Sequence, residues 1–155
     1  MCDSDARDVR REARLRQLGT RTPRCTECGE RDPFALTLTP DGLCYECQAL
    51  AAGKSWIEGQ HPAGRPNHPA TVPMPGNDHR VVDDHKNDWP RQTLRNPEGS
   101  PLLRAAACLR GWLDTLRLIV ERTVGWIPPF LEQLDRWLTD QLGRGWWRQM
   151  PAVDI

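Results

Sequence analysis

Two Cys-x-x-Cys pairs constrain this chain of 155 residues more than any other feature of its sequence. The segments CTEC and CYEC are separated by residues 29–43 and supply Cys25, Cys28, Cys44 and Cys47. Two residues between thiolates let one tight turn present both sulfurs to a single ion, and the second pair completes a tetrahedron. The spacing therefore predicts one structural zinc ion whose four sulfur ligands leave no coordination position open for chemistry.

The residues around the two pairs predict how the metal module folds. Gly29 suits the tight bend after the first pair, residues 34–39 (FALTLT) alternate like a strand, and residues 40–42 (PDG) are typical of a turn. After Cys47, residues 48–53 favour a short helix that ends at glycine. This order of knuckle, hairpin, knuckle and helix is that of treble-clef zinc modules.

Helical patterns mark both ends of the chain. Residues 3–18 predict a charged surface helix with Ser4 as N-cap, whose arginines could alternatively contact phosphate. Residues 83–101 are a polar connector, and Pro128 and Pro129 separate two amphipathic helices after it. We expect an α+β fold with a boundary near residue 100: a charged helix in 1–21, a zinc-knuckle and histidine-containing module in 22–90, a linker in 91–101 and a helical hairpin in 102–150.

The composition of the chain limits where the protein can be located in the cell and which partners it can bind. The 21 basic and 21 acidic residues balance, so no segment offers a broad cationic surface for coating nucleic acid. The chain begins without an apolar leader, and six charges interrupt residues 102–124, which excludes a membrane span there. We therefore expect a cytoplasmic protein. Five tryptophans follow residue 111 and suit a hairpin core, a homo-oligomer interface or a protein-partner surface in 102–150, and less well a membrane surface. Cys2 and Cys108 have no partner motif.

All four histidines lie in the stretch EGQHPAGRPNHPATVPMPGNDHRVVDDH. His61, Asn67, the apolar residues 71–73 and the segment NDHR at 77–80 follow one another in this order. This order resembles the motif of HNH nucleases, the ββα-metal superfamily, many of which also carry paired CxxC zinc knuckles. The resemblance covers about residues 25–89. It implies a metal-dependent nuclease that hydrolyses DNA phosphodiester bonds.

The resemblance also implies roles for single residues. His61 would match the general base that takes a proton from the attacking water. Asn67 would match the residue that fixes the histidine loop, and His79 would match a ligand of a catalytic divalent ion such as Mg. Arg65 and Arg80 would be placed to contact phosphate.

Position 60 departs from the family pattern. It holds glutamine where the family usually has a histidine or aspartate as a second metal ligand, and Glu58, Asp78 or His85 are the candidates to replace it. The HNH-like protein could itself be a degenerate, inactive descendant of a nuclease. Two other readings therefore stay open. One rival is a non-catalytic zinc-binding module that recognises nucleic acid or protein; the other is a scaffold whose helical hairpin carries the function. The histidines would then be loop residues or a second metal-holding set.

Overall fold

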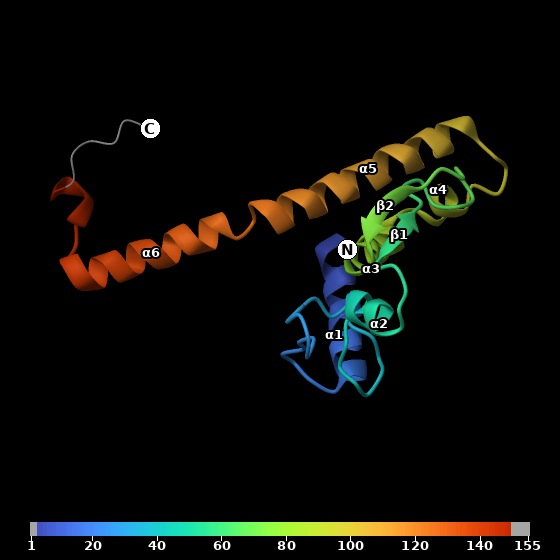
Figure 1. Cartoon of the computed structure of the whole chain (residues 1–155). Helices are drawn as coiled ribbons and strands as arrows, with labels where there is room; N and C mark the ends of the chain where they lie inside the picture. Colours follow the sequence, from blue (N-terminus) through green and yellow to red (C-terminus); the bar gives the residue numbers. More distant parts are fainter. Residues whose placement is uncertain (1–2, 150–155) are drawn as a thin grey trace. The chain divides into compact units, whose positions relative to one another are not determined.

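The computed structural model describes residues 3–149 and forms an α+β fold (Figure 1). Cys2 and the side chain of Ser4, both named by the sequence analysis, lie outside what the structure describes. Two compact units divide at Leu116, inside a long helix rather than near residue 100. The elements are α1 (Asp3–Leu18), α2 (Tyr45–Ala51), β1 (Ile57–Gln60), β2 (Val72–Pro75), α3 (Gly76–His85), the 3-10 turn η1 (Lys86–Asp88), α4 (Arg91–Arg95), α5 (Pro101–Thr123), α6 (Ile127–Leu142) and η2 (Trp146–Gln149).

The predicted strand at residues 34–39 is wrong. Only Leu36 pairs with another strand-like residue, Cys44, through a single bridge. A turn in which the Ala35 amide donates to the Asp32 carbonyl bends the chain just before this point. The predicted turn at 40–42 follows close behind, with Gly42 at φ +67°. Too little extended chain remains between the two turns for a strand.

The helix after the second cysteine pair is confirmed, but it starts earlier than predicted. It spans Tyr45–Ala51, with Cys44 as its N-cap: the Cys44 sulfur accepts a hydrogen bond from the Cys47 amide. One of the four cysteines of the CxxC pairs therefore also serves as the helix cap. Gly53 then takes φ +66°, which is left-handed backbone that glycine adopts without strain.

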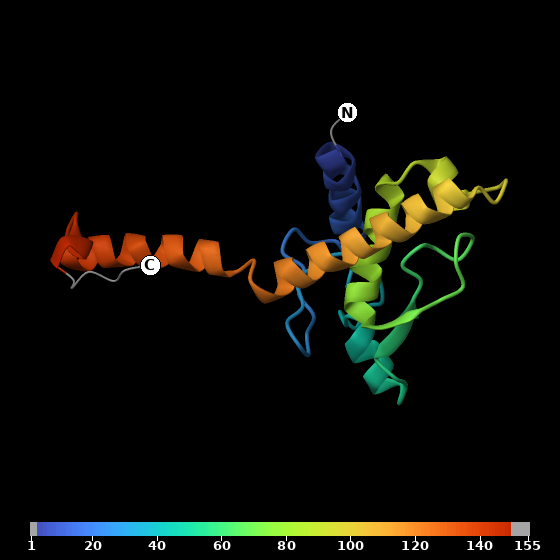
Figure 2. The same cartoon turned by 90° about the horizontal axis from the view of Figure 1, so that it is seen from above.

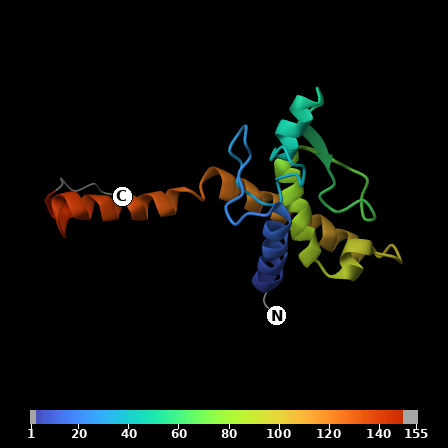
Figure 3. The ribbon, with the colours of Figure 1, turned by 90° about the horizontal axis from the view of Figure 1, so that it is seen from below.

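A two-stranded antiparallel hairpin and a helix follow the cysteine module. β1 pairs with β2 in a register that places Glu58 opposite Met74 and Gln60 opposite Val72, and α3 begins directly after β2. Figure 3 shows α2 at the end of α3 where that helix begins. Residues 83–101 are not the polar connector that the sequence predicted, because they contain the end of α3, η1 and α4. Their polar side chains are buried where they bond to other elements, and that pairing is invisible in a hydropathy pattern.

The N-terminal helix is confirmed over Asp3–Leu18, yet two of its arginines are structural rather than solvated. Arg10 donates to Asp84 at 2.8 Å and to Asp88 at 2.7 Å, and so binds α1 to α3 and η1. Arg14 donates to the Leu36 carbonyl at 2.6 Å and to the Pro33 carbonyl at 3.1 Å. Figure 2 shows α1, in blue, beside these elements. The helix therefore ties the cysteine module to the segment that follows it.

The first part of α5 packs on the loop after β1. A Cβ on Gly111 would fall on the carbonyl group of Pro62, so only glycine allows this approach. Trp89 donates from Nε1 to Asp114 at 2.8 Å, and Ala107 is fully buried against Trp89 and Ala63. This half of α5 therefore belongs to the first unit and supports its loops.

The second unit contains the end of α5, α6 and η2. Helix α6 buries none of its residues, although its apolar side chains recur at three- and four-residue steps. Whether the two helices form the predicted hairpin, and whether a second copy or another protein covers them, stays a prediction. No helix in residues 3–149 has the length and apolar character to cross a bilayer.

Candidate metal centre and histidine pocket

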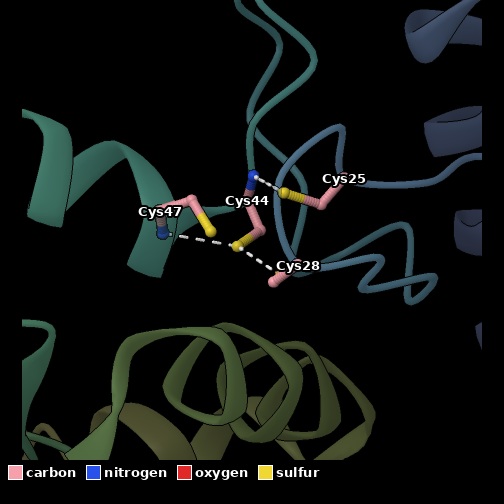
Figure 4. A group of neighbouring side chains, drawn as sticks. All are labelled: Cys25, Cys28, Cys44 and Cys47. Atoms are coloured by element: carbon pink, nitrogen blue, oxygen red, sulfur yellow. Dashed lines mark hydrogen bonds between the residues drawn. The ribbon is translucent and has the colours of Figure 1, made fainter.

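The four cysteines of the two pairs come together at one point (Figure 4). Their sulfur atoms all lie within 4.8 Å of one another, and the sulfurs of Cys28 and Cys44 are 3.6 Å apart. Two ligands of a tetrahedral zinc at about 2.3 Å would be separated by about 3.8 Å, so the arrangement fits such an ion. Within residues 3–149 no other group of three or more cysteine, histidine or acidic side chains is gathered in this way. The cluster can hold a metal ion.

Backbone amides donate to sulfurs of the cluster, and at Cys25 they favour the thiolate form. The Cys44 amide donates to the Cys25 sulfur at 3.3 Å. Burial opposes ionisation of Cys25, but hydrogen bonds from the backbone of Cys28, Cys44 and Glu27 outweigh it and lower the pKa of this thiol to about 6. For Cys47, burial and the neighbouring sulfurs raise the pKa instead. An ion at this point would supply the positive charge that four crowded thiolates require.

Helix α2 connects the cysteine cluster to α3. The Asn77 amide donates to the Glu46 carboxylate at 3.1 Å, and the Asn77 side-chain oxygen accepts from the Glu46 amide at 3.2 Å. The guanidinium of Arg80 lies 4.7 Å from the ring centre of Tyr45, a cation–π distance. Because Cys44 of the cluster caps α2, these contacts connect the cluster to the first turn of α3.

The histidine-rich segment forms an open pocket of about 360 Å³ in the first unit. Its lining comes from the end of β1, the loop after it, α3, η1 and α4. Four of the residues singled out by the HNH resemblance line it: His61, Arg65, His79 and Arg80. The fold therefore brings together residues that are up to 19 positions apart (80 minus 61).

Asn67 lies behind this pocket and shapes its loop. Its side chain is buried, and Nδ2 donates to the Ala63 carbonyl at 3.1 Å and to the Thr93 carbonyl at 2.9 Å. The amide thus ties the loop after His61 to α4. This is the geometry of a residue that fixes a loop, and it keeps Asn67 away from any atom bound in the pocket.

His61 follows directly on β1 and is only partly held by the protein. Its backbone carbonyl accepts a hydrogen bond from Lys86 at 2.8 Å. Its ring nitrogen Nδ1 is buried and has no hydrogen-bond partner among the described residues. A water molecule or a bound group in the pocket could satisfy this nitrogen.

His79 is held from both sides by carboxylates. Its Nδ1 lies 2.6 Å from Glu58 and its Nε2 lies 3.3 Å from Asp83. Only the doubly protonated ring can donate at both nitrogens, and the bond to Asp83, helped by Glu58 against the opposing effect of burial, raises the pKa of His79. Burial would raise the pKa of Asp83, but hydrogen bonds from His79 and Lys86 hold it well below its usual range.

No protein-family model, curated protein or solved structure matches this chain.

Sequence analysis missed Asp83 and Lys86, which the structure places in the pocket. Asp83 could have been found, because it is four residues after His79 and thus on the same face of α3. Of the candidates to replace Gln60, Glu58 contacts the other nitrogen of His79. His85 faces away, with Nδ1 3.9 Å from Asp114 on α5. Asp78 is not among the lining residues.

The pocket also contains donors that suit a divalent cation. Gln60 is fully buried, its Nε2 lies 3.4 Å from Asp83, and its Oε1 has no hydrogen-bond partner in the described part of the chain. The Gln60 amide, the Asp83 carboxylate and Nε2 of His79 are therefore neighbours. The amide presents its nitrogen to Asp83, so it would have to turn over for Oε1 to bind an ion beside this carboxylate. Mixed oxygen and imidazole ligands suit Mn, Mg or Zn. The buried Oε1 without a partner shows that the amide is not fully satisfied by the described residues, and an ion bound by the turned amide would satisfy it.

Proposed function

We propose that this chain is an HNH-like protein whose histidine pocket acts on a DNA phosphodiester. The observation that carries the proposal is the order β1, β2 and α3, which puts His61 and His79 on one pocket together with Arg65 and Arg80. In this proposal the cysteine cluster holds zinc as a scaffold, because a shell of four sulfurs leaves no position for water. The chemistry then belongs to the pocket alone.

The chain's own residues would divide the work as follows. His61, whose Nδ1 has no described partner, would take the proton from a water molecule attacking phosphorus. Arg65 is exposed at the pocket mouth and would bind and orient the phosphate. Gln60, Asp83 and His79 would hold a divalent ion, with Nε2 of His79 releasing its proton as the ion binds and Nδ1 keeping its hydrogen bond to Glu58. The bound ion would stabilise negative charge on the phosphate and the leaving oxygen. Asn67 would keep the His61 loop in place.

A second candidate function is binding without catalysis. It is favoured by the contacts that already occupy the pocket: both ring nitrogens of His79 face carboxylates, and Lys86 lies 2.8 Å from Asp83. A pocket satisfied in this way could recognise a phosphate through its basic residues and leave the phosphodiester intact. The zinc scaffold would be the same in both cases.

Plasmid cleavage separates the two functions. The zinc-loaded protein is incubated with supercoiled plasmid and Mg, Mn or Ni, beside His61→Ala and the control His68→Ala, an exposed histidine outside this pocket. Nicking by wild type and by His68→Ala, with a loss of about 100-fold in His61→Ala, supports the nuclease. Equal nicking in all three proteins, or none in any, rejects it. Retarded plasmid without nicking supports the binding module.

A further inference from the structure

Lys86 is a buried cation among the residues that line the histidine pocket. Only 8% of the residue is exposed. Its ammonium nitrogen lies 2.8 Å from the Asp83 carboxylate oxygen Oδ1 and 2.8 Å from the His61 carbonyl oxygen. The ammonium therefore joins η1 to the residue after β1. It also pairs with Asp83, whose carboxylate lies beside Gln60 and His79.

The choice of lysine at this position is informative. The chain has 21 basic residues, of which only Lys54 and Lys86 are lysine. An arginine fork would tend to take both carboxylate oxygens, whereas an ammonium is a compact charge that can pair with one. Here Lys86 takes Oδ1 and leaves Oδ2 to Nε2 of His79 at 3.3 Å. Asp83 is thus shared between a resident cation and the donor set that a divalent ion would use.

We propose that Lys86 is a built-in competitor of divalent cations for Asp83, so that the pocket binds a metal ion only against the resident ammonium. The proposal rests on the proposed function in taking Gln60, His79 and Asp83 as the cation donors. A divalent ion on these donors would lie within a few ångströms of the Lys86 ammonium, and like charges this close in a buried site repel strongly. Lys86 therefore lowers the affinity of the pocket for a divalent ion.

The test is binding of Mn²⁺ alone to the full chain with zinc already at the cysteines. Affinity is measured by calorimetry and by the electron paramagnetic resonance signal of free Mn²⁺, without DNA. We expect Lys86→Met to bind Mn²⁺ at least about tenfold more tightly than wild type, while Lys54→Met, an exposed lysine, leaves the affinity unchanged. Asp83→Asn added to Lys86→Met removes the gain.

Several outcomes overturn the proposal. The first is that Lys86→Met binds Mn²⁺ no more tightly than wild type, or does not bind it. The second is that Lys86→Arg, which keeps the charge, gains as much Mn²⁺ affinity as Lys86→Met. Zinc content and circular dichroism establish that each variant is folded. If Lys86→Met is unfolded, Lys86→Gln is titrated with the same criteria, because its amide can still donate to the His61 carbonyl.

The result is independent of plasmid cleavage. A tenfold gain in Mn²⁺ affinity together with an absence of nicking by wild type rejects the nuclease function and keeps the role of Lys86. If nicking depends on His61 but Lys86→Met gains no Mn²⁺ affinity, the nuclease function is kept and the role of Lys86 is rejected.

Discussion

The cysteine cluster and the histidine pocket lie in the same unit but are completed in different ways. The cluster has four equivalent donors, with sulfurs gathered within 4.8 Å and backbone amides pointing at them. This set of donors is compatible with one structural metal ion. The pocket has unlike donors, and its carboxylate Asp83 already has Lys86 and His79 as partners. In our proposals an ion would complete the first site, whereas it would have to compete with Lys86 for Asp83 in the second.

The two sites also differ in how much of the chain builds them. Residues 25–47 supply every donor of the cluster, so a short and nearly self-contained segment decides it. The pocket draws on β1, α3, η1 and α4, and further elements hold these in place: Arg10 of α1 binds Asp84, and Gly111 of α5 lies against Pro62. We therefore expect the cluster to be sensitive to loss of a sulfur donor. We expect the pocket to be sensitive also to substitutions at distant residues that pack against its elements.

Loss of one cluster sulfur should have the largest effect. Cys44 is fully buried and also caps α2, so Cys44→Ser removes a metal ligand and weakens the helix start. We expect loss of most bound zinc and of about 4 kcal/mol or more of the free energy of unfolding. Metal content by mass spectrometry and urea unfolding measure both.

The matched control for that substitution is Cys108→Ser, a partly buried cysteine outside the cluster. It should keep its zinc and lose about 1 kcal/mol or less. Retention of full zinc content by Cys44→Ser would contradict the assignment of the cluster as a metal site.

Gly111→Ala should have an intermediate effect, and it should act on the pocket alone. The added methyl group meets the Pro62 carbonyl, so we expect a loss of about 1–3 kcal/mol and a shift of the loop that carries His61. Urea unfolding measures the first, the NMR signals of His61 report the second, and zinc content should not change. In an unpacked helix the same substitution would stabilise by about 1 kcal/mol, so a gain in stability would show that α5 does not rest on this loop.

The pH behaviour of His79 is the smallest expected effect. Because Asp83 and Glu58 raise its pKa, an NMR titration of the ring should give a midpoint above the ordinary 6.5, and Asp83→Asn should bring it down. The stability that His79 contributes should be complete below that ordinary value and lost as the pH rises through the raised one. The Asp83 contribution runs the other way and is lost only in strong acid, as pH falls toward its depressed pKa. A midpoint at or below 6.5 would mean that His79 is not held between the two carboxylates.

Prediction from sequence worked where local spacing controls the result. The fixed spacing of the two CxxC pairs predicted that their four sulfurs gather at one point. The helix at Asp3–Leu18 follows from its composition and from Gly19, where it stops. Prediction failed where contacts between residues far apart in the chain determine the local structure. β1 is the short, polar stretch IEGQ, and it becomes a strand only because Val72–Pro75 returns to pair with it. The polar composition of residues 83–101 predicts a solvated segment, but in the fold Asp84 accepts a hydrogen bond from Arg10 and Trp89 donates one to Asp114.

By itself, therefore, the sequence determined the cysteine cluster, the N-terminal helix and the order of the histidines, since each depends on neighbours within a few residues or on a fixed spacing. Tertiary structure alone decided which side chains share the pocket. Asp83 could be inferred from helical periodicity, but the place of Lys86 could not, because the His61 carbonyl that it contacts lies 25 residues away in the chain. Buried charges are located by the partners that the whole fold provides, and no local pattern encodes those partners.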